Sequence, residues 1–277
     1  MKKLIALLSW AAFSVCLNAQ LTLGPTVGTF GVLAGSTVTN SGNTIVIGNL
    51  GVSPLTAITG FTGIAPGGPG IVTGTIHSAD AVAAQAQAEL LAAYNAAKNA
   101  ASTGTRNGDL GGLTLFSGVY TASSSLGITG TVTLDAQNNA NAQFIFQIGS
   151  ALTTATGSNV NLINGALPAN VFWQVGSSAT IGTSASFSGN ILAFSSISFG
   201  TGASLQGRAL ARNGAVTLLD NAITTPATLG GPLGGPPVAA GFGLAPAPSS
   251  LILVAIALVC TGIYQARKRL PTLFRRG

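Results

Sequence analysis

An 18-residue repeat restricts the fold of this chain more than any other feature of its sequence. Residues 179–196 read ATIGTSASFSGNILAFSS, and residues 197–214 read ISFGTGASLQGRALARNG. Placed one above the other, the segments match at Phe187 and Leu205 and at the small residues on either side. A repeat of this length, built from short apolar segments and small turn residues, is typical of a β-solenoid. We therefore predict a mainly β protein, a parallel stack of coils in which each coil buries its apolar side chains against its neighbours.

The repeat also predicts two rows of hydroxyl side chains. Residues 152–164 continue the pattern with a longer return loop, so three successive coils can be aligned. The first row contains Thr153, Thr180 and Ser198, and the second contains Thr156, Thr183 and Thr201. Strands of neighbouring coils lie about 4.8 Å apart, so outward residues at matching positions form straight rows at that spacing. Threonine is also a good strand residue, so composition alone leaves a purely structural role open.

One segment departs from the strand pattern. Residues 78–102 are rich in alanine and contain neither glycine nor proline. We predict a long helix over about residues 79–100, with Ser78 as its N-cap. Its buried stripe at helical spacing consists of Val82, Ala86, Leu90, Ala93 and Ala97. Because this helix interrupts the coils, the solenoid is predicted to be discontinuous in sequence.

Charged residues are scarce, which excludes one large class of partner. Only 6% of the residues are charged, against roughly 25% in an average globular protein. The net charge of +6 comes from the two ends of the chain, because the four basic and five acidic residues between 4 and 266 leave −1. Binding of nucleic acid requires clustered lysine and arginine, so nucleic acid is not an expected partner. We expect two of the basic residues, Arg208 and Arg212, to form ion pairs with Asp135 or Asp220.

The N-terminus has the three parts of a secretory signal. Lys2 and Lys3 precede an apolar stretch that ends at Leu17, and Ala19 supplies a small residue before the cleavage point. We predict a signal peptide over residues 1–19. The protein is therefore expected to be secreted or held at the cell surface or outer envelope, with its solenoid domain over residues 20–225.

The C-terminal part has a different composition. Residues 226–248, rich in proline and glycine, are predicted to form an extended linker. In residues 249–277, an apolar run over 251–264 is followed by a basic end. This tail resembles the PEP-CTERM sorting signal of Gram-negative bacteria, although Ala247 stands where that signal has a glutamate; a plain membrane anchor is the alternative. Either tail would connect the protein to a membrane or an extracellular polymer.

Several longer strings resemble the microbial ice-binding proteins of bacteria, fungi and diatoms. They include VLAGSTVTN at 32–40, TGTIHSADAVAAQAQAELLAAYN at 73–95 and GNILAFSSISFGTGASLQGRALARNGAVTL at 189–218. The resemblance covers nearly all of residues 24–225. It implies a discontinuous parallel β-solenoid of roughly triangular section, with one helix packed alongside and one flat face that adsorbs to ice.

The sequence offers little material for catalysis. His77 is the single histidine, beside the start of the predicted helix. Asp109, Asp135 and Asp220 are far apart in the sequence, and each lies next to a predicted turn, where aspartate commonly caps backbone groups. Hydrolases and lyases need acids or bases held together in one site. We expect no enzymatic activity and no small-molecule substrate.

Metal ions and cofactors are not expected either. Cys16 and Cys260 both lie in the end segments, so the predicted solenoid contains no thiolate ligand. The glycine-rich strings are not followed by helices, as a dinucleotide-binding loop would be.

The two hydroxyl rows suggest a function that needs no charge. A threonine hydroxyl hydrogen-bonds to water while its methyl group restrains neighbouring waters, and a rigid array of such groups binds without an ordering cost. The leading hypothesis is an antifreeze or ice-recrystallisation-inhibiting protein that adsorbs to the ice crystal surface through Thr153, Thr156, Thr180, Thr183, Ser198 and Thr201. The alternative is a cell-surface adhesin or matrix protein built on the same scaffold.

Overall fold

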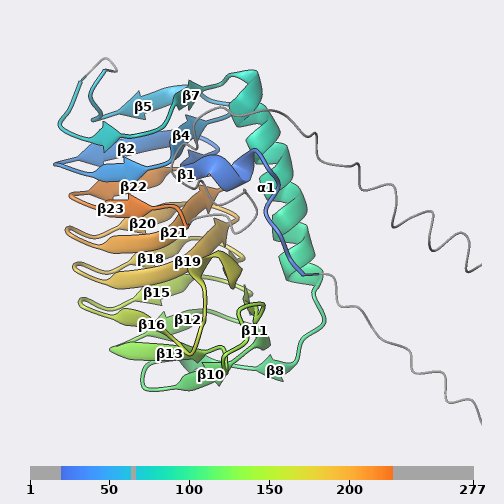
Figure 1. Ribbon diagram of the computed structural model, residues 1–277. Coiled ribbons are helices and arrows are strands. Elements are labelled where there is room, and N and C mark those ends of the chain that lie inside the picture. Colours follow the sequence, from blue (N-terminus) through green and yellow to red (C-terminus); the bar gives the residue numbers. More distant parts are fainter. Residues whose placement is uncertain (1–19, 64–66, 227–277) are drawn as a thin grey trace, which may run out of the picture. The chain divides into compact units, whose positions relative to one another are not determined.

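The chain forms a stack of coils with three flat faces and a single long helix alongside (Figure 1). The computed structural model describes residues 20–63 and 67–226. A complete coil contributes a short strand to each face, and all the strand pairs are parallel. The predicted β-solenoid with one packed helix is confirmed.

The first face is an eight-stranded sheet, which we call the ladder face. In order along the stack, its strands are β5 (Ala57–Thr59), β2 (Thr37–Ser41), β22 (Val216–Leu219), β20 (Ile197–Phe199), β18 (Ala179–Ile181), β15 (Leu152–Thr154), β12 (Leu126–Ile128) and β9 (Gly108–Asp109).

The other two faces belong to one fifteen-stranded sheet that folds around an edge of the stack. The helix face contains β7 (Ile76–Ser78), β4 (Asn49–Val52), β1 (Phe30–Ala34), the second halves of β21 (Ser204–Ala211) and β19 (Ser186–Ala193), β17 (Val171–Val175), β14 (Phe144–Ile148), β11 (Gly118–Ala122) and β8 (Gly104–Thr105). The third face contains β6 (Ile71–Val72), β3 (Ile45–Ile47), β23 (Ala222–Thr224), the first halves of β21 and β19, β16 (Asn159–Ile163), β13 (Thr131–Asp135) and β10 (Thr114–Phe116).

The stacking order differs from the order along the chain, as predicted. On each face an N-terminal strand lies between a C-terminal strand and another N-terminal one: β1 between β21 and β4, β2 between β22 and β5, β3 between β23 and β6. Figure 1 shows the blue N-terminal coils resting on the orange C-terminal coils. The helix α1 (Ala81–Asn99) carries the chain back along the stack, and the later coils then fill the space up to the first ones.

A column of aromatic rings occupies part of the core inside the coils. Tyr120, Phe146 and Trp173 occupy matching positions of three successive coils. The rings of Phe146 and Trp173 are stacked with centroids 4.0 Å apart, and Phe187 packs against Trp173 at 5.1 Å. The indole N–H of Trp173 donates to the carbonyl oxygen of Ser188 (3.0 Å), so its one polar atom is satisfied. The predicted pairing of Phe187 with Leu205 is observed in register.

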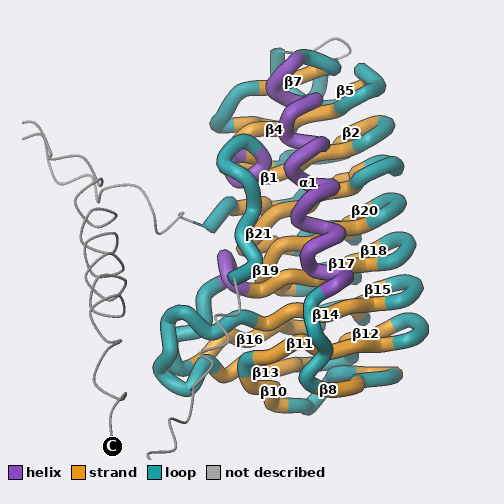
Figure 2. The backbone as a smooth tube through the Cα atoms, turned by 90° about the vertical axis from the view of Figure 1, so that its right-hand side faces the viewer, coloured by secondary structure: helices purple, strands orange, loops and turns teal. Residues whose placement is uncertain are grey.

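The helix lies across the helix face (Figure 2) and covers a second, smaller core. Small residues on α1 allow close contact with apolar side chains that point outward from the coils. These are Leu33, Ile145, Phe172, Leu192 and Leu210. The helix begins two residues later and ends one residue earlier than predicted.

Two details of the helix prediction are wrong. The N-cap is Asp80, whose carboxylate accepts a hydrogen bond from the Ala83 N–H (2.8 Å), whereas Ser78 ends β7 and its hydroxyl donates to Thr56. Val82 is 40% exposed, and the buried position one residue later is taken by Ala83. The other four predicted contact residues are buried.

Two short 3₁₀ turns, η1 (Val27–Thr29) and η2 (Pro168–Asn170), precede strands of the helix face.

Within the described ranges, no helix is both long enough and apolar enough to cross a membrane. The predicted signal peptide, the tail 249–277 and the linker beyond Pro226 lie outside the described residues.

Candidate functional site

The outward side chains of the ladder face form one row of hydroxyl groups across six consecutive coils. Thr153 pairs with Thr180 and Thr180 with Ser198 in parallel register, as the repeat predicted. The row then continues through Thr217, Thr39 and Thr59. All six side chains are exposed or partly exposed. Coil spacing sets neighbouring hydroxyls about 4.8 Å apart.

This row rests on a stiff base. The strand neighbours of Thr180 are Ala179 and Ile181, which point into the core and are almost completely buried. Every strand of the ladder face is hydrogen-bonded within the sheet, and branching at Cβ restricts the threonine side chains. The arrangement therefore offers a flat, ordered surface with little conformational freedom left to lose on binding.

The second predicted row lies at a corner rather than within the strands. Thr156, Thr183 and Thr201 each occupy the second position of a tight turn that leads from the ladder face to the third face. The turns are stacked by hydrogen bonds: the Gly157 N–H donates to Thr183 O (2.9 Å), and the Ser184 N–H donates to Thr201 O (3.0 Å). All three threonines are exposed. The structure thus brings them together as a row that borders the ladder face.

Three members of the first row could not be found from the repeat. Thr217 follows the last aligned segment, and Thr39 and Thr59 lie near the N-terminus. The pairing of β20 with β22 places Thr217 in the row, whereas the places of Thr39 and Thr59 depend on the first coils resting on the last one. The string TVTN around Thr39 has the strand pattern, but nothing local to it indicates which coil it stacks on.

Charge is almost absent from this surface. Among the strand residues of the ladder face, only Asp109 is charged, and it lies at one end of the stack. Its carboxylate accepts hydrogen bonds from the N–H groups of Thr129 (2.9 Å) and Gly111 (2.7 Å). Bonding to Thr129, and then to Gly111, lowers the pKa of Asp109. This carboxylate serves to close a turn.

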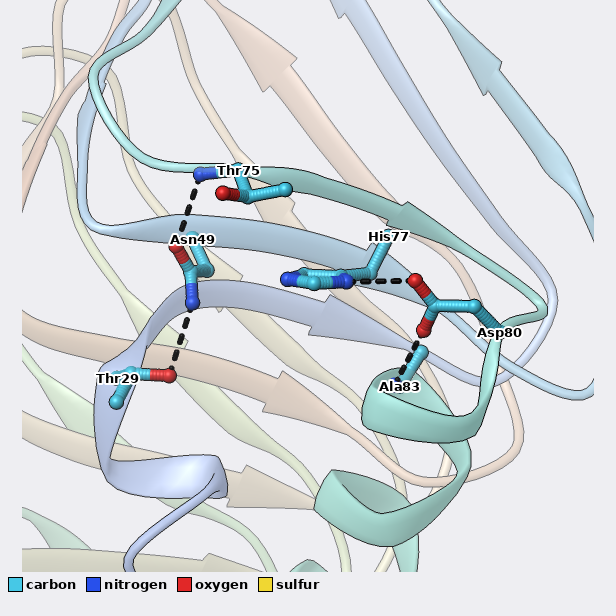
Figure 3. Close-up of polar contacts among 6 residues, drawn as sticks. All are labelled: Thr29, Asn49, Thr75, His77, Asp80 and Ala83. Atoms are coloured by element: carbon cyan, nitrogen blue, oxygen red, sulfur yellow. Dashed lines mark hydrogen bonds and ion pairs between the residues drawn. The ribbon is translucent and has the colours of Figure 1, made fainter.

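The single histidine is part of the helix start. His77 Nδ1 lies 2.6 Å from Asp80 Oδ2, and its ring packs against Phe30 with centroids 5.4 Å apart. The other oxygen of Asp80 accepts a hydrogen bond from the Ala83 N–H. The bond from Ala83 and the contact with His77 lower the pKa of Asp80. Figure 3 shows this pair beside Asn49, which links the backbone N–H of Thr75 to the hydroxyl of Thr29. These contacts tie β7, β4 and β1 to the helix.

The remaining aspartates have separate local roles. Asp135 accepts hydrogen bonds from the Gln137 N–H and the Asn164 side chain, both at 2.8 Å, and Asp220 accepts from the Asn43 N–H. In the part of the chain that the structure describes, no three histidine, cysteine or acidic residues lie close enough to hold a metal ion.

The expected ion pairs of the two arginines do not form. Arg208 is buried and donates to the carbonyl oxygen of Gly28 (2.7 and 2.9 Å) and to Asn190 Oδ1 (2.9 Å). Burial lowers the pKa of Arg208 to about 10. Arg212 pairs with no acid, since the contact of His77 with Asp80 is the one ion pair among residues 20–63 and 67–226. For Arg208, neutral acceptors that the fold brings together therefore stand in place of the predicted carboxylates.

Comparison of the sequence with known proteins identifies one matching family. Residues 32–224 match the model of a family described as ice-binding-like. An ice-binding protein of Nostoc sp. (strain HG1) is 47% identical over 224 residues, which cover 80% of this chain and 81% of that protein. An ice-binding protein of Colwellia sp. is 35% identical over 214 residues, covering 72% of this chain and 81% of that one.

Solved structures show the same coil arrangement. A crystal structure of an ice-binding protein from an Antarctic biological consortium superposes with a TM-score of 0.72 at 46% identity, covering 81% of this chain and 96% of that chain. That of an ice-binding protein from the Antarctic ascomycete Antarctomyces psychrotrophicus gives a TM-score of 0.69 at 39% identity, covering 73% and 98%.

Proposed function

Because the chain belongs to the ice-binding-like family, we propose that it binds ice and that the ladder face is the surface that adsorbs to the crystal. The observation that carries this proposal is the row of six hydroxyl side chains in register on consecutive coils. Molecules adsorbed in this way would pin the advancing ice front, which lowers the freezing point or stops recrystallisation.

The chemistry of the row suits a surface made of water. Each threonine offers a hydroxyl that donates and accepts hydrogen bonds, next to a methyl group that restrains water without binding it. A charged side chain would hold its own hydration shell and disturb an ice-like arrangement. Many weak contacts at a regular spacing can act together because the sheet keeps them fixed before binding.

The other two faces fit this role less well. The helix face is covered by α1. The third face is chemically mixed: one of its rows runs from Thr131 through Asn159, Ser186, Ser204 and Ala222 to Ile45 and Ile71. It also carries Asp135 and the half-exposed ring of Phe116. The proposal includes no catalytic role, because each acid of the described residues accepts hydrogen bonds in a separate local contact: Asp80 caps the helix, Glu89 holds the segment at Thr26, and the other three lie at turns.

Substitution of one large residue on each of two faces tests the assignment. Thr180→Tyr places a ring in the middle of the ladder face, and Asn161→Tyr places the same ring on the third face. We expect Thr180→Tyr to weaken ice adsorption by roughly tenfold or more, about 1.4 kcal/mol, because it lifts the flat surface away from the crystal. Asn161→Tyr should leave thermal hysteresis and recrystallisation inhibition unchanged.

Both variants should keep the wild-type melting temperature, which serves as the folding control. Thr183→Tyr, made in parallel, measures how far the binding surface extends over the corner row. If Asn161→Tyr lost activity while Thr180→Tyr kept it, the third face would be the binding surface. If the unaltered protein neither shaped ice nor slowed grain growth, the proposed function would be wrong.

The tail supports a further part of the proposal, retention of the exported protein at the cell envelope or in extracellular polymer. The support is the sequence of residues 1–19 and of 249–277, with its apolar run and basic end. Removal of residues 249–277 should release the protein into the culture medium, as cell fractionation would show. A protein that stays with the cells after this deletion would contradict retention by the tail.

A further inference from the structure

We propose that a groove along the corner between the helix face and the ladder face binds an acidic polysaccharide. The groove has a volume of about 540 Å³ and is bordered by the C-terminal half of α1 on one side. Its floor is a row of residues that follow the last residues of β11, β14, β17, β19 and β21. These are Ser123, Gly149, Gly176, Phe194 and Arg212. The proposal does not depend on ice binding.

The first observation is that the groove contains two basic side chains and no acidic partner for them. Arg212 and Lys98 both line the groove, and no acidic residue lines it. Neither cation forms an ion pair within the described residues. The Arg212 Nε atom is buried and has no hydrogen-bond acceptor there. A buried donor without a hydrogen bond costs free energy. The planar guanidinium group matches the geometry of a carboxylate.

The shape of the groove indicates a chain rather than a single ion. Its floor crosses five consecutive coils at a spacing of about 4.8 Å, which gives a length of roughly 19 Å. Two of the five floor positions are glycines, so the middle of the floor carries no side chain. The groove is open to solvent rather than enclosed, so a linear polymer can enter from the side.

The walls offer the contacts that a sugar ring uses. Phe194 is 46% exposed and packs against Tyr94 with ring centroids 6.2 Å apart. An exposed aromatic face gives apolar contact area to the C–H groups of a pyranose ring. Hydroxyl and amide groups of Ser123 and Asn95 also line the groove and can form hydrogen bonds with sugar hydroxyls.

The helix end does not work against an anion here. The last carbonyl groups of a helix carry partial negative charge. In this protein the Gln147 side chain donates to the carbonyl oxygens of Ala97 (2.9 Å), Lys98 (3.2 Å) and Ala100 (2.7 Å). These acceptors are therefore occupied, and Lys98 adds a full positive charge beside them.

Titration calorimetry of the full chain with oligogalacturonate, and with its neutral methyl ester, tests the proposal. We expect the charged oligomer to bind with an affinity that falls as salt is added, and the ester to bind at least roughly tenfold more weakly. Arg212→Gln and Phe194→Ala should each reduce binding of the charged oligomer. Arg212→Lys should give an intermediate loss, because it keeps the charge but not the fork.

Arg106→Gln is the matched control for net charge. Arg106 lies over the Tyr120 ring, 5.1 Å from its centroid, and does not line the groove. The Arg106→Gln variant should bind the charged oligomer like the wild type. A loss of affinity equal to that of Arg212→Gln would indicate attraction to overall charge and would overturn the proposed site. Binding of sulfate as tightly as the oligomer would show a site for simple anions and would overturn the polysaccharide proposal. No binding of oligogalacturonate at millimolar concentration would overturn the proposal.

Discussion

Glu89 connects the middle of the helix to the segment that precedes β1. Its carboxylate accepts hydrogen bonds from the backbone N–H groups of Thr26 and Val27, both at 2.8 Å, and from the Gln85 side chain (3.1 Å). Partial burial raises the pKa of Glu89, but the hydrogen bonds from Val27, Gln85 and Thr26 outweigh it, and the pKa lies below its ordinary value. The ionised form therefore stabilises the folded state.

This contribution has a defined pH dependence. A lowered pKa in the folded state means that the stabilisation is present above the unfolded-state pKa, about 4.3, and is lost as the pH falls through the folded-state value. We expect Glu89→Gln to lower the free energy of unfolding by about 1 kcal/mol at pH 7. The two proteins should become equally stable near pH 2.

Urea denaturation of the wild type and Glu89→Gln at a series of pH values measures this difference. Subtraction of the two curves removes the effects of Asp80 and Asp109, whose pKa values are also lowered. A difference that stays constant down to pH 2 would show that the carboxylate charge has no part in holding the N-terminal segment.

At the level of elements, the helix is held by the small size of its buried residues. Ala86 is completely buried against the coils, and Ala84 is exposed on the opposite side. Ala86→Leu should destabilise the protein by about 1–3 kcal/mol, because a larger side chain pushes α1 away from the helix face. Ala84→Leu should change stability by less than about 0.5 kcal/mol.

Guanidinium denaturation followed by helical circular dichroism gives both values. Ala84→Leu is the control for helix propensity, since alanine and leucine both favour helices. Equal effects of the two substitutions would mean that close packing under Ala86 does not position the helix.

Elements differ in how far the sequence alone defines them. The repeat aligned Thr153 with Thr180 and Phe187 with Leu205 correctly, because coils adjacent in sequence are adjacent in space. The helix was found, but its contact face was misjudged at Val82, because alanine on nearly every side gives little apolar contrast. Asp80 and Ser78 are both good caps, and only the bond to Ala83 distinguishes them.

At the level of the whole molecule, the candidate surface depends on contacts between distant parts of the chain. Two of its six hydroxyl residues, Thr39 and Thr59, join the row through one stacking step, in which β22 meets β2. No local pattern specifies that step, because it requires the apolar edge of the last coil and the matching edge of the first to meet across the whole domain. The neutral surface was predictable from composition, but its full extent was not.

That same step has a consequence for synthesis of the protein. The Asn221 N–H that donates to the Thr44 hydroxyl lies 177 residues further along the chain. A ribosome adding 5–20 residues per second needs roughly 9 to 35 s to make that span. For this interval the first strands to emerge have no neighbour on one edge, and a chaperone has its longest opportunity to hold them before the last coil closes the gap.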